Sequence, residues 1–344
     1  MYSVERRRVQ KTGSSSFIIT LPKDWIDATG LKSGDFVIVE KLGNKLVIVP
    51  STAEPTQLKA TLKVHSGVDR MQLLRVLLAT YISGYSIISL VFERSTPNLA
   101  SMISEIKNLA RLKLAGMEVI EESTSSITFK VLLNLQELPL INAIRRLHLI
   151  VSSMLNDTLH LVSNGDISIA QMIIQRDDEA DRFHHLIVRE LSVALLDIKV
   201  QHELGISNVT EVLSYRIIAR NLERIADHAV NIAKRVVAVG GLSHPEYVYN
   251  YLRGDIEVFE KAMSALYSLN RKEAEEVIAK VKNIVTEIEE VIYGKVLEAP
   301  LEPKEKITVA MILDSIKRIA RYSNGIAEAV LNIKASKMPE LEVK

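Results

Sequence analysis

Residues 222–233 read LERIADHAVNIA and residues 316–327 read IKRIARYSNGIA, so one sequence pattern occurs twice, 94 residues apart. In the first copy, apolar residues succeed one another at spacings of four, three, four, three and four positions: Ile218, Leu222, Ile225, Ala229, Ile232 and Val236. Such spacing gathers them on one stripe of an α-helix, along which helices pack into bundles. The repeated pattern therefore predicts two copies of one helical bundle.

The repeat extends upstream and organises the second part of the chain. Residues 181–191 match residues 287–297 more weakly, 106 residues apart. From Pro139 onward every segment has helical periodicity, with helices expected at residues 140–163, 167–200, 208–239, 248–268, 271–297 and 305–334. Three helices in each copy predict one three-helix bundle over residues 139–240 and another over residues 248–335.

Two acidic pairs in the first copy are each four positions apart, Asp177 with Asp181 and Glu223 with Asp227. Residues at this spacing share a helix face, where like charges repel each other. The aspartates fall inside an apolar stripe and the other pair borders one, so partial burial would require a cation. If the two helices are neighbours, the four carboxylates converge into an oxygen-rich set that suits Mg²⁺, Mn²⁺ or bridged iron. His185, next on the stripe, would tilt the set toward a transition metal.

A second interpretation stays open, in which these carboxylates belong to a solvated helix surface. Arg220 and Arg224 stand three positions before Glu223 and Asp227, a spacing typical of ion pairs on one helix.

The second copy replaces the acidic residues. Asn283 and Glu287 stand where the first copy has its aspartates, and Lys317 and Arg321 stand where it has Glu223 and Asp227. Charged Lys and Arg side chains bind no cation. We therefore expect internal pairing there, with Lys317 or Arg321 facing Glu287.

The first 50 residues predict a small β-rich unit that needs a partner. Strands are expected at residues 4–9, 17–21, 36–40 and 45–49, with a short helix beginning at Pro22. Some 46 residues form too small a core to be stable alone, so the unit is expected to dimerise. Residues 1–50 carry eight basic and five acidic residues, whereas the whole chain has a net charge of only +1.

A linker at residues 51–57 and a central domain at residues 58–136 follow. Strands and helices are expected in the order β-α-β-α-β-β, which predicts an α+β domain, with a ferredoxin-like sandwich as the candidate arrangement. No catalytic constellation is found in it. The fold class of the whole chain is accordingly multidomain α+β, with an all-α carboxyl-terminal part.

Composition excludes several classes of protein. The 344 residues are 47% hydrophobic and 25% charged, which excludes wholesale disorder, and the absence of Cys excludes disulfides and thiolate metal sites. No apolar run reaches the roughly 18 residues that span a bilayer, and the first residues lack a signal peptide's apolar core, so we expect a cytoplasmic protein without membrane insertion. Catalytic Ser-His-Asp, phosphate-cradle and dinucleotide patterns are missing. We expect no enzyme, with a carboxylate-bridged metal enzyme as the alternative.

Residues 140–335 resemble the PhoU family, which consists of two repeated three-helix bundles and negatively regulates phosphate uptake. The resemblance rests on RNLERIADHAVNIA at residues 220–233 and DDEAD at residues 177–181. In that family, acidic motifs of this spacing bind metal clusters. The resemblance implies a divalent or trivalent metal ion, with Mg, Mn, Fe and Zn as candidates, held by Asp177, Asp181, Glu223 and Asp227.

Residues 4–50 resemble the swapped-hairpin DNA-binding modules of the AbrB/SpoVT/MazE type. The resemblance rests on RVQKTG at residues 8–13, FIITLPKDW at residues 17–25 and GLKSGDFVIV at residues 30–39. It implies two interlocked chains whose basic groups approach DNA phosphates. The matching candidates are Arg6, Arg7, Arg8, Lys11, Ser14, Ser15 and Ser16. An ordinary charged strand edge is the alternative.

The combination resembles archaeal-type PhoU regulators. It implies a homodimeric, DNA-binding transcription regulator of phosphate homeostasis with a metal-binding helical sensor. The alternative is an adaptor that contacts a phosphate ABC transporter ATPase or a sensor kinase and whose first domain only dimerises.

Overall fold

The computed structural model describes residues 4–51, 57–93, 96–133 and 138–337. The chain divides into two compact units between Thr56 and Gln57. Residues 52–56 of the expected linker lie outside the described residues.

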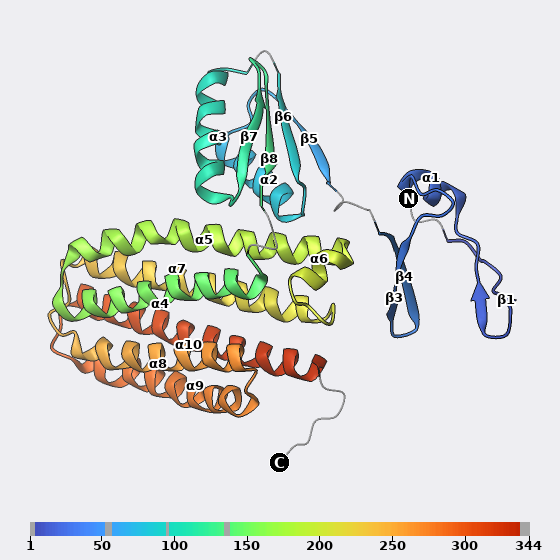
Figure 1. Cartoon of the computed structure of the whole chain (residues 1–344). Coiled ribbons are helices and arrows are strands. Elements are labelled where there is room, and N and C mark those ends of the chain that lie inside the picture. The colour runs from blue at the N-terminus through green and yellow to red at the C-terminus, as the bar shows by residue number, and fades with distance from the viewer. Residues whose placement is uncertain (1–3, 52–56, 94–95, 134–137, 338–344) are drawn as a thin grey trace. The chain divides into compact units, whose positions relative to one another are not determined.

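The first unit consists of two short hairpins and one helix (Figure 1). Strands β1 (Gln10–Thr12) and β2 (Ser16–Ile18) pair antiparallel, and α1 (Lys23–Thr29) ends at Gly30, whose φ of 69° is left-handed. Strands β3 (Val37–Leu42) and β4 (Lys45–Pro50) form the second hairpin. The strand expected at residues 4–9 is wrong: the first strand begins at Gln10, because the turn that pairs it is centred on Gly13.

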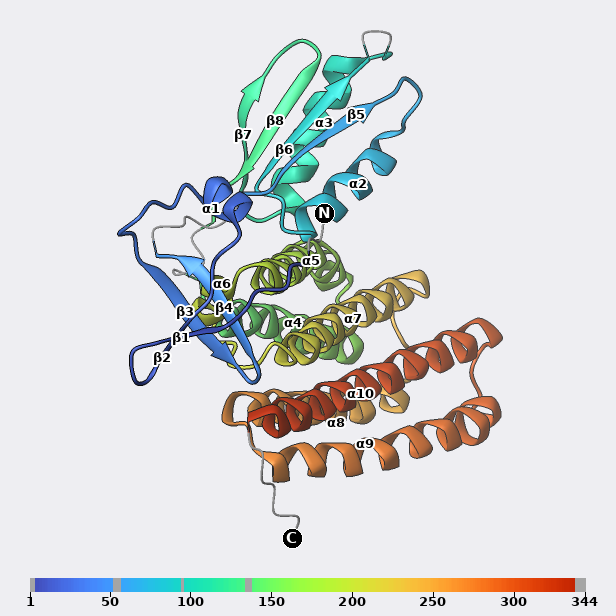
Figure 2. The same ribbon diagram turned by 90° about the vertical axis from the view of Figure 1, so that its right-hand side faces the viewer.

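The central domain is a four-stranded sheet with two helices (Figure 2). Its elements are β5 (Lys59–Val64), α2 (Arg70–Ile82), β6 (Ile87–Phe92), α3 (Leu99–Lys113), β7 (Met117–Glu122) and β8 (Ser126–Val131). The strand order is β5-β6-β8-β7, with β5 parallel to β6 and the other neighbours antiparallel. The α+β prediction is confirmed. The ferredoxin-like candidate does not hold, because that fold has the order β-α-β-β-α-β and separates the strands that are adjacent here.

One face of this sheet forms the core of the domain. Alternate residues of β6 and β8 are buried, among them Leu90 and Phe129, and α2 and α3 supply Leu77 and Ile106. Asp69 caps α2, since its carboxylate accepts the backbone N–H groups of Met71 and Gln72.

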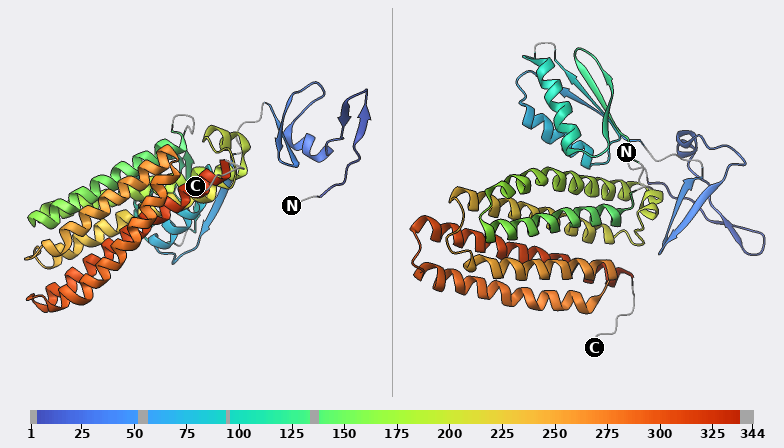
Figure 3. Two further views of the ribbon diagram at one scale, coloured as in Figure 1. Left: turned by 90° about the horizontal axis from the view of Figure 1, so that it is seen from below. Right: turned by 60° about the vertical axis from the view of Figure 1, so that its left-hand side comes forward.

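The remaining chain is helical, and its long helices lie alongside one another (Figure 3). The first bundle contains α4 (Leu140–Asn164), α5 (Ile167–Leu196), the short α6 (Ile198–Glu203) and α7 (Glu211–Ala238). The second contains α8 (Glu246–Ser268), α9 (Arg271–Val291), the π-helical turn η1 (Ile292–Val296) and α10 (Pro303–Lys337). The helix expected at residues 167–200 is interrupted at Asp197, which ends α5 and caps α6.

The predicted seam is the core of both bundles. All six seam residues of α7 have no exposed surface, and neither do their counterparts 94 positions later in α10: Ile312, Ile316, Ile319, Ser323, Ile326 and Val330. Helices α7 and α10 pack against each other, so the buried residues of both copies form one continuous core. The two bundles are thus joined along the repeated pattern itself.

Candidate functional site

Helices α5 and α7 pack side by side, and each carries two of the four predicted carboxylates. Burial raises the pKa of Asp177 to about 6, and the charges of Asp181 and Asp227 add to that rise. Burial likewise raises the pKa of Glu223 to about 7, with added repulsion from Asp227 and Asp181. Each acidic pair therefore feels the charge of the other, and the expected convergence into one metal-binding set stays a prediction. We call these four residues the carboxylate cluster.

Arginines of α7 neutralise part of the carboxylate cluster. Arg220 donates to Glu223 Oε1 over 3.0 Å, and Arg224 donates to Asp227 Oδ2 over 2.9 Å. The second oxygen of Glu223, Oε2, is buried and accepts no hydrogen bond from any described residue. Its nearest ion-pair atom is Arg224 Nε, 3.7 Å away. The cluster therefore keeps one buried oxygen whose hydrogen-bonding capacity is unused.

A lysine of the central domain supplies a further cation. Lys113, the last residue of α3, places its Nζ 2.6 Å from Asp178 Oδ1 and 2.9 Å from Asp181 Oδ2. The backbone carbonyl of Lys113 lies 3.1 Å from Nδ1 of His185. Sequence reasoning missed Lys113, because nothing local marks a lysine at a helix end as the partner of an acid 68 residues away.

Carboxylate oxygens are the ligands that Mg²⁺ and Mn²⁺ prefer, but in this structure basic side chains pair with several members of the carboxylate cluster. Burial and the neighbouring carboxylates raise the pKa of Asp177 and of Glu223. Within the described part of the chain, no three His, Asp or Glu side chains are gathered as a ligand shell. His185 turns one ring nitrogen to the backbone of α3, and burial lowers its pKa.

The second copy has the inverted charge pattern. Lys317 Nζ lies 3.2 Å from Glu289 Oε1 and 3.3 Å from Asp314 Oδ1, and Arg321 Nη2 lies 3.6 Å from the same Glu289 oxygen. The expected internal pairing of basic and acidic groups is confirmed. The acidic partner, however, is Glu289 rather than Glu287, and residues two positions apart face different sides of a helix.

The predicted DNA-binding residues lie on one stretch of the first unit. Arg6, Arg7 and Arg8 are exposed on the extended segment before β1, where Arg7 pairs with Glu5. Lys11 lies in β1, Ser16 begins β2, and Ser14 and Ser15 form the turn between them. All seven side chains are exposed, and their contact with DNA stays a prediction.

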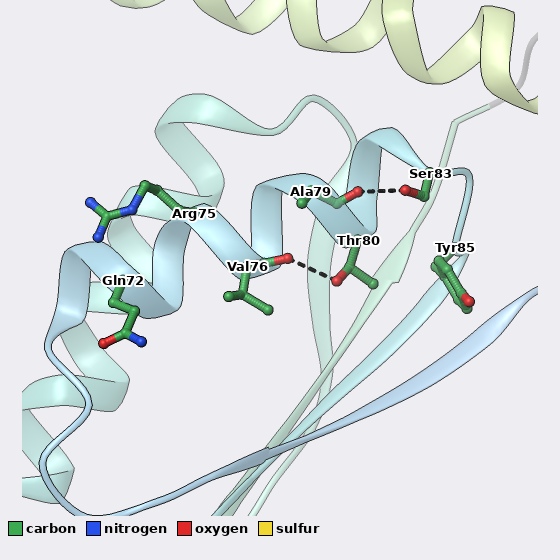
Figure 4. Close-up of a pocket in the computed structure, with 7 residues that line it drawn as sticks. All are labelled: Gln72, Arg75, Val76, Ala79, Thr80, Ser83 and Tyr85. Carbon is green, nitrogen blue, oxygen red and sulfur yellow. Dashed lines mark hydrogen bonds between the residues drawn. The ribbon is translucent and has the colours of Figure 1, made fainter.

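A pocket of about 360 Å³ lies on the outer face of α2 (Figure 4). It is lined by Gln72, Arg75, Val76, Ala79, Thr80, Ser83 and Tyr85. The hydroxyls of Thr80 and Ser83 each bond a carbonyl one turn earlier in α2, over 2.8 Å, so their donors are satisfied. None of the predicted site residues lines this pocket. Among the described helices, none is both long and apolar enough to cross a bilayer.

Two family models match the chain. The PhoU domain matches twice, over residues 144–236 and 253–330, which correspond to the two helical copies. The model described as antidote-toxin recognition MazE, bacterial antitoxin, matches residues 10–56. The central domain falls between these matches.

Curated relatives and solved structures carry the same family name. A phosphate-specific transport system accessory protein PhoU homolog from Rhizobium meliloti is 23% identical over 200 residues, which is 56% of this chain and 83% of that protein. A homolog of the same name from Caulobacter vibrioides is 35% identical over 95 residues, 28% of this chain and 38% of that protein. The crystal structure of the phosphate transport system regulatory protein PhoU from Streptococcus pneumoniae is 18% identical, with a TM-score of 0.48 over 59% of this chain and 96% of its own.

Proposed function

The chain carries two PhoU domains behind a MazE-type domain, and from this combination we propose that it is a dimeric DNA-binding regulator of phosphate uptake. Its first unit binds DNA, and its helical part responds to a bound metal ion. The role is regulatory rather than enzymatic, as in the accessory proteins it is similar to.

The apolar surface of the first unit carries the proposal. Phe17, Phe36 and Leu46 are 68%, 81% and 63% exposed, and Pro50 is the only buried residue among those described in this unit. Large apolar side chains left exposed on a unit with so little buried core indicate an interface. A second copy of the unit, interlocked by its hairpins, would cover these side chains and present two sets of basic residues to one duplex.

The test compares DNA binding by the full chain and by residues 57–344, using promoter fragments of phosphate-uptake genes in a mobility-shift assay. We expect the truncated chain to lose binding and the full chain to lose affinity steeply with salt, because phosphate contacts release counterions. Sedimentation of the full chain checks the dimer, which Phe36→Asp should dissociate.

Three arginines provide a sharper version of this test. Arg6→Ala, Arg7→Ala and Arg8→Ala together should weaken binding and lower the salt dependence by about 0.9 per lost phosphate contact. The matched control removes three exposed lysines of the same unit, Lys23, Lys41 and Lys45. An equal loss of DNA affinity in both triple variants would mean that the arginines act only through the overall positive charge of the unit.

For the metal, we propose that Asp177, Asp181, Glu223 and Asp227 hold a hard divalent or trivalent cation, with Mg, Mn, Fe and Zn as candidates. The cation would supply the positive charge that these partly buried carboxylates lack. Asp181→Asn with Asp227→Asn should abolish bound metal in elemental analysis. Glu287→Gln with Glu289→Gln, in the second copy, is the matched control and should leave the metal content unchanged.

A second function, favoured by the names of the relatives, is that of an adaptor. The helical part would dock on a phosphate ABC transporter ATPase or a sensor kinase, and the first unit would only dimerise. Failure of the full chain to bind any promoter fragment at low salt, with capture of a transporter component by the same protein, would favour the adaptor.

A further inference from the structure

Helices α7 and α10 pack against each other and meet at two polar contacts. The His228 ring stacks on the Tyr322 ring, with their centroids 5.8 Å apart. Seven positions away on each helix, Arg235 Nη1 donates to the Ser315 hydroxyl at 2.5 Å. The numbering rises along α7 while it falls along α10, so the two helices run antiparallel. Seven positions are about two helical turns, which places both contacts on one face of each helix.

A polar side chain lies between these two contacts on each helix. On α7, Asn231 stands three positions after His228 and four before Arg235. On α10, Arg318 has the same spacings from the two contact residues of that helix. Spacings of three and four keep a residue on the stripe of its neighbours, so Asn231 and Arg318 face each other across the two helices. We call Asn231, Arg235 and Arg318 the arginine patch.

The arginine patch has N–H groups that no protein acceptor uses. Arg235 spends one of its donors on Ser315, and Arg318 donates through Nε to Asp314 at 2.9 Å. The side chain of Asn231 bonds none of the residues that the structure describes. Each guanidinium has five N–H donors and the amide has two, so donors remain on all three side chains. Arg318 is exposed and the other two are half-buried, which leaves them accessible to a ligand.

The positive charge of the arginine patch is only partly balanced. Asp314 is the acid that acts on Arg235. This carboxylate already bonds Arg318 at 2.9 Å and lies 3.3 Å from Lys317 Nζ. Over the described ranges of the chain, Arg235 has no carboxylate of its own within ion-pair distance. One shared acid therefore stands against three basic groups.

The imidazole beside the arginine patch responds to the same excess of positive charge. Burial is the main cause that lowers the pKa of His228 to about 4, and the charges of Arg318, Arg235 and Arg224 lower it as well. Its Nδ1 is buried and has no hydrogen-bond partner among the described residues. Asp227, the preceding residue, pairs with Arg224 at 2.9 Å. The ring is therefore neutral at physiological pH, and this part of the surface lacks an anion.

The other side of the stacked rings is built differently. The repeat offset of 94 places Gly325 and Ala329 where the arginine patch has Asn231 and Arg235. A Cβ at Gly325 would lie 2.5 Å from Asn221 Nδ2, so the two helices approach closely there. Neither Gly325 nor Ala329 has a side-chain donor. The free donors are thus concentrated on one side of the rings, which is a difference that helix packing alone does not require.

We propose that the arginine patch binds a phosphate group, with Arg235 and Arg318 as cationic donors and the Asn231 amide as a third donor. Guanidinium groups match the paired oxygens of phosphate. A carboxylate would neutralise only one of the two guanidinium groups, whereas a phosphate, with a charge near −2, neutralises both. Neither the carboxylate cluster nor the first unit takes part. Phosphate binding therefore goes beyond the regulator proposed above and gives the helical part a ligand that can be tested independently of metal and DNA.

The first measurement is titration calorimetry of the full chain with inorganic phosphate, after treatment with a chelator and in a phosphate-free buffer. Arg235→Met keeps the aliphatic stem without the charge, and it should weaken phosphate binding by about tenfold or more, because a charge-assisted pair is lost. The matched control is Lys234→Met, which removes an exposed charge from the neighbouring position of α7. This control should bind phosphate as the unaltered chain does.

A second variant fills the arginine patch with a built-in anion. Asn231→Asp places a carboxylate between the two guanidinium groups with almost no change of shape. It should raise the melting temperature of the chain and abolish phosphate binding, because the donors are then satisfied within the protein. This variant decides the question even if Arg235→Met fails to fold. A folded Asn231→Asp chain with the phosphate affinity of the unaltered chain would refute the site.

Adenosine monophosphate, titrated in the same way, separates free phosphate from the phosphate group of a larger ligand. Binding of inorganic phosphate that both variants weaken assigns the site to the free anion. Binding of adenosine monophosphate alone, with the same dependence on both variants, assigns it to a larger phosphorylated molecule. If the unaltered chain binds neither, the site is refuted. Arg235→Met should leave metal content and DNA binding unchanged, so a failure here is distinguishable from a failure of the proposed function.

Discussion

The two helical copies share their apolar seam and differ in the charged face beside it. In the first copy, Glu223 and Asp227 are acidic residues bordered by arginines. In the second, Lys317 and Arg321 occupy the equivalent positions and meet Glu289. The two copies thus share the same apolar packing but carry opposite charges at equivalent positions. This indicates that the seam determines the fold, whereas the neighbouring face can take different charges.

The turns between the first two helices of each copy show the same conservation of geometry. Gly165 ends α4 at a φ of 67° and Asp166 caps α5, whereas Leu269 ends α8 at a φ of 47° and Asn270 caps α9. A left-handed residue followed by a side-chain cap is thus retained although both residues differ. Equivalent positions can therefore be counted from this turn.

The largest expected effect tests the shared seam. Leu222→Ala and Ile316→Ala each remove a side chain with no exposed surface, and each should lower the free energy of unfolding by about 3 kcal/mol. Urea unfolding followed by helical circular dichroism measures both, and Leu213→Ala, 69% exposed on α7, is the control that should change little. A large loss of unfolding free energy in only one of the two variants would show that the two seams are not equivalent.

The next effect concerns the domain that docks on the first copy. Arg189→Met removes four hydrogen bonds from a buried guanidinium to residues 81–86, at the end of α2 and just after it, and should weaken docking by about 3 kcal/mol. Faster hydrogen exchange at residues 81–86 would report it. Arg146→Met, which loses only an exposed ion pair with Glu179, should leave that hydrogen exchange unchanged. If both variants raised it equally, Arg189 would not be the main source of the docking free energy.

The seam was predictable because it is local: a period of 3.6 residues places Leu222 and Ile225 on one stripe whatever surrounds the helix. The same periodicity placed Asp181 and Glu223 on partly buried helix faces, but it could not establish that α5 and α7 are neighbours, as the structure shows. The order of strands in the central sheet could not be read in this way, since β6 pairs with β8 across residues distant in the chain.

Two features of the charged faces escaped prediction for different reasons. Lys113 belongs to another domain, and its contact depends on how α3 docks. Glu289 was displaced by two positions because the weak match of residues 181–191 with 287–297 gives an offset of 106, whereas the helix caps Asp166 and Asn270 are 104 positions apart. Neither a contact between domains nor the correct offset of a weak repeat can be read from residue spacing alone.

A buried acid of the second copy offers a stabilising substitution. Asp255 of α8 is fully buried, neither of its oxygens has a hydrogen-bond partner among the described residues, and burial raises its pKa. Counting back from the caps Asp166 and Asn270, the equivalent residue of the first copy is Val151, which is also buried. Asp255→Val should therefore raise the free energy of unfolding by about 2 kcal/mol. Asp255→Asn, which keeps a buried polar group, should not raise the free energy of unfolding. If Asp255→Val lowered it, the carboxylate would be needed for the stability of the fold.

The smallest expected effect concerns charge in the first copy and depends on pH. Asp177 titrates near 6 and Glu223 near 7 in the folded chain, above their ordinary values, so the folded state binds more protons than the unfolded state between about pH 4 and pH 7. The stability of the metal-free protein should therefore fall as pH rises through that window. Asp177→Asn should recover about 1 kcal/mol at about pH 8, once solvent screening is allowed for, and little at about pH 4.

Chelator-treated protein is used for this last comparison, with urea unfolding measured at both pH values. Glu275→Gln, an exposed acid of α9, serves as the control and should show no such pH dependence. A gain that is equal at both pH values would assign the effect of Asp177→Asn to packing instead of charge. A gain confined to the higher pH would show that the ionised Asp177 carboxylate destabilises the first copy. Its negative charge would then be only partly balanced by the neighbouring basic side chains.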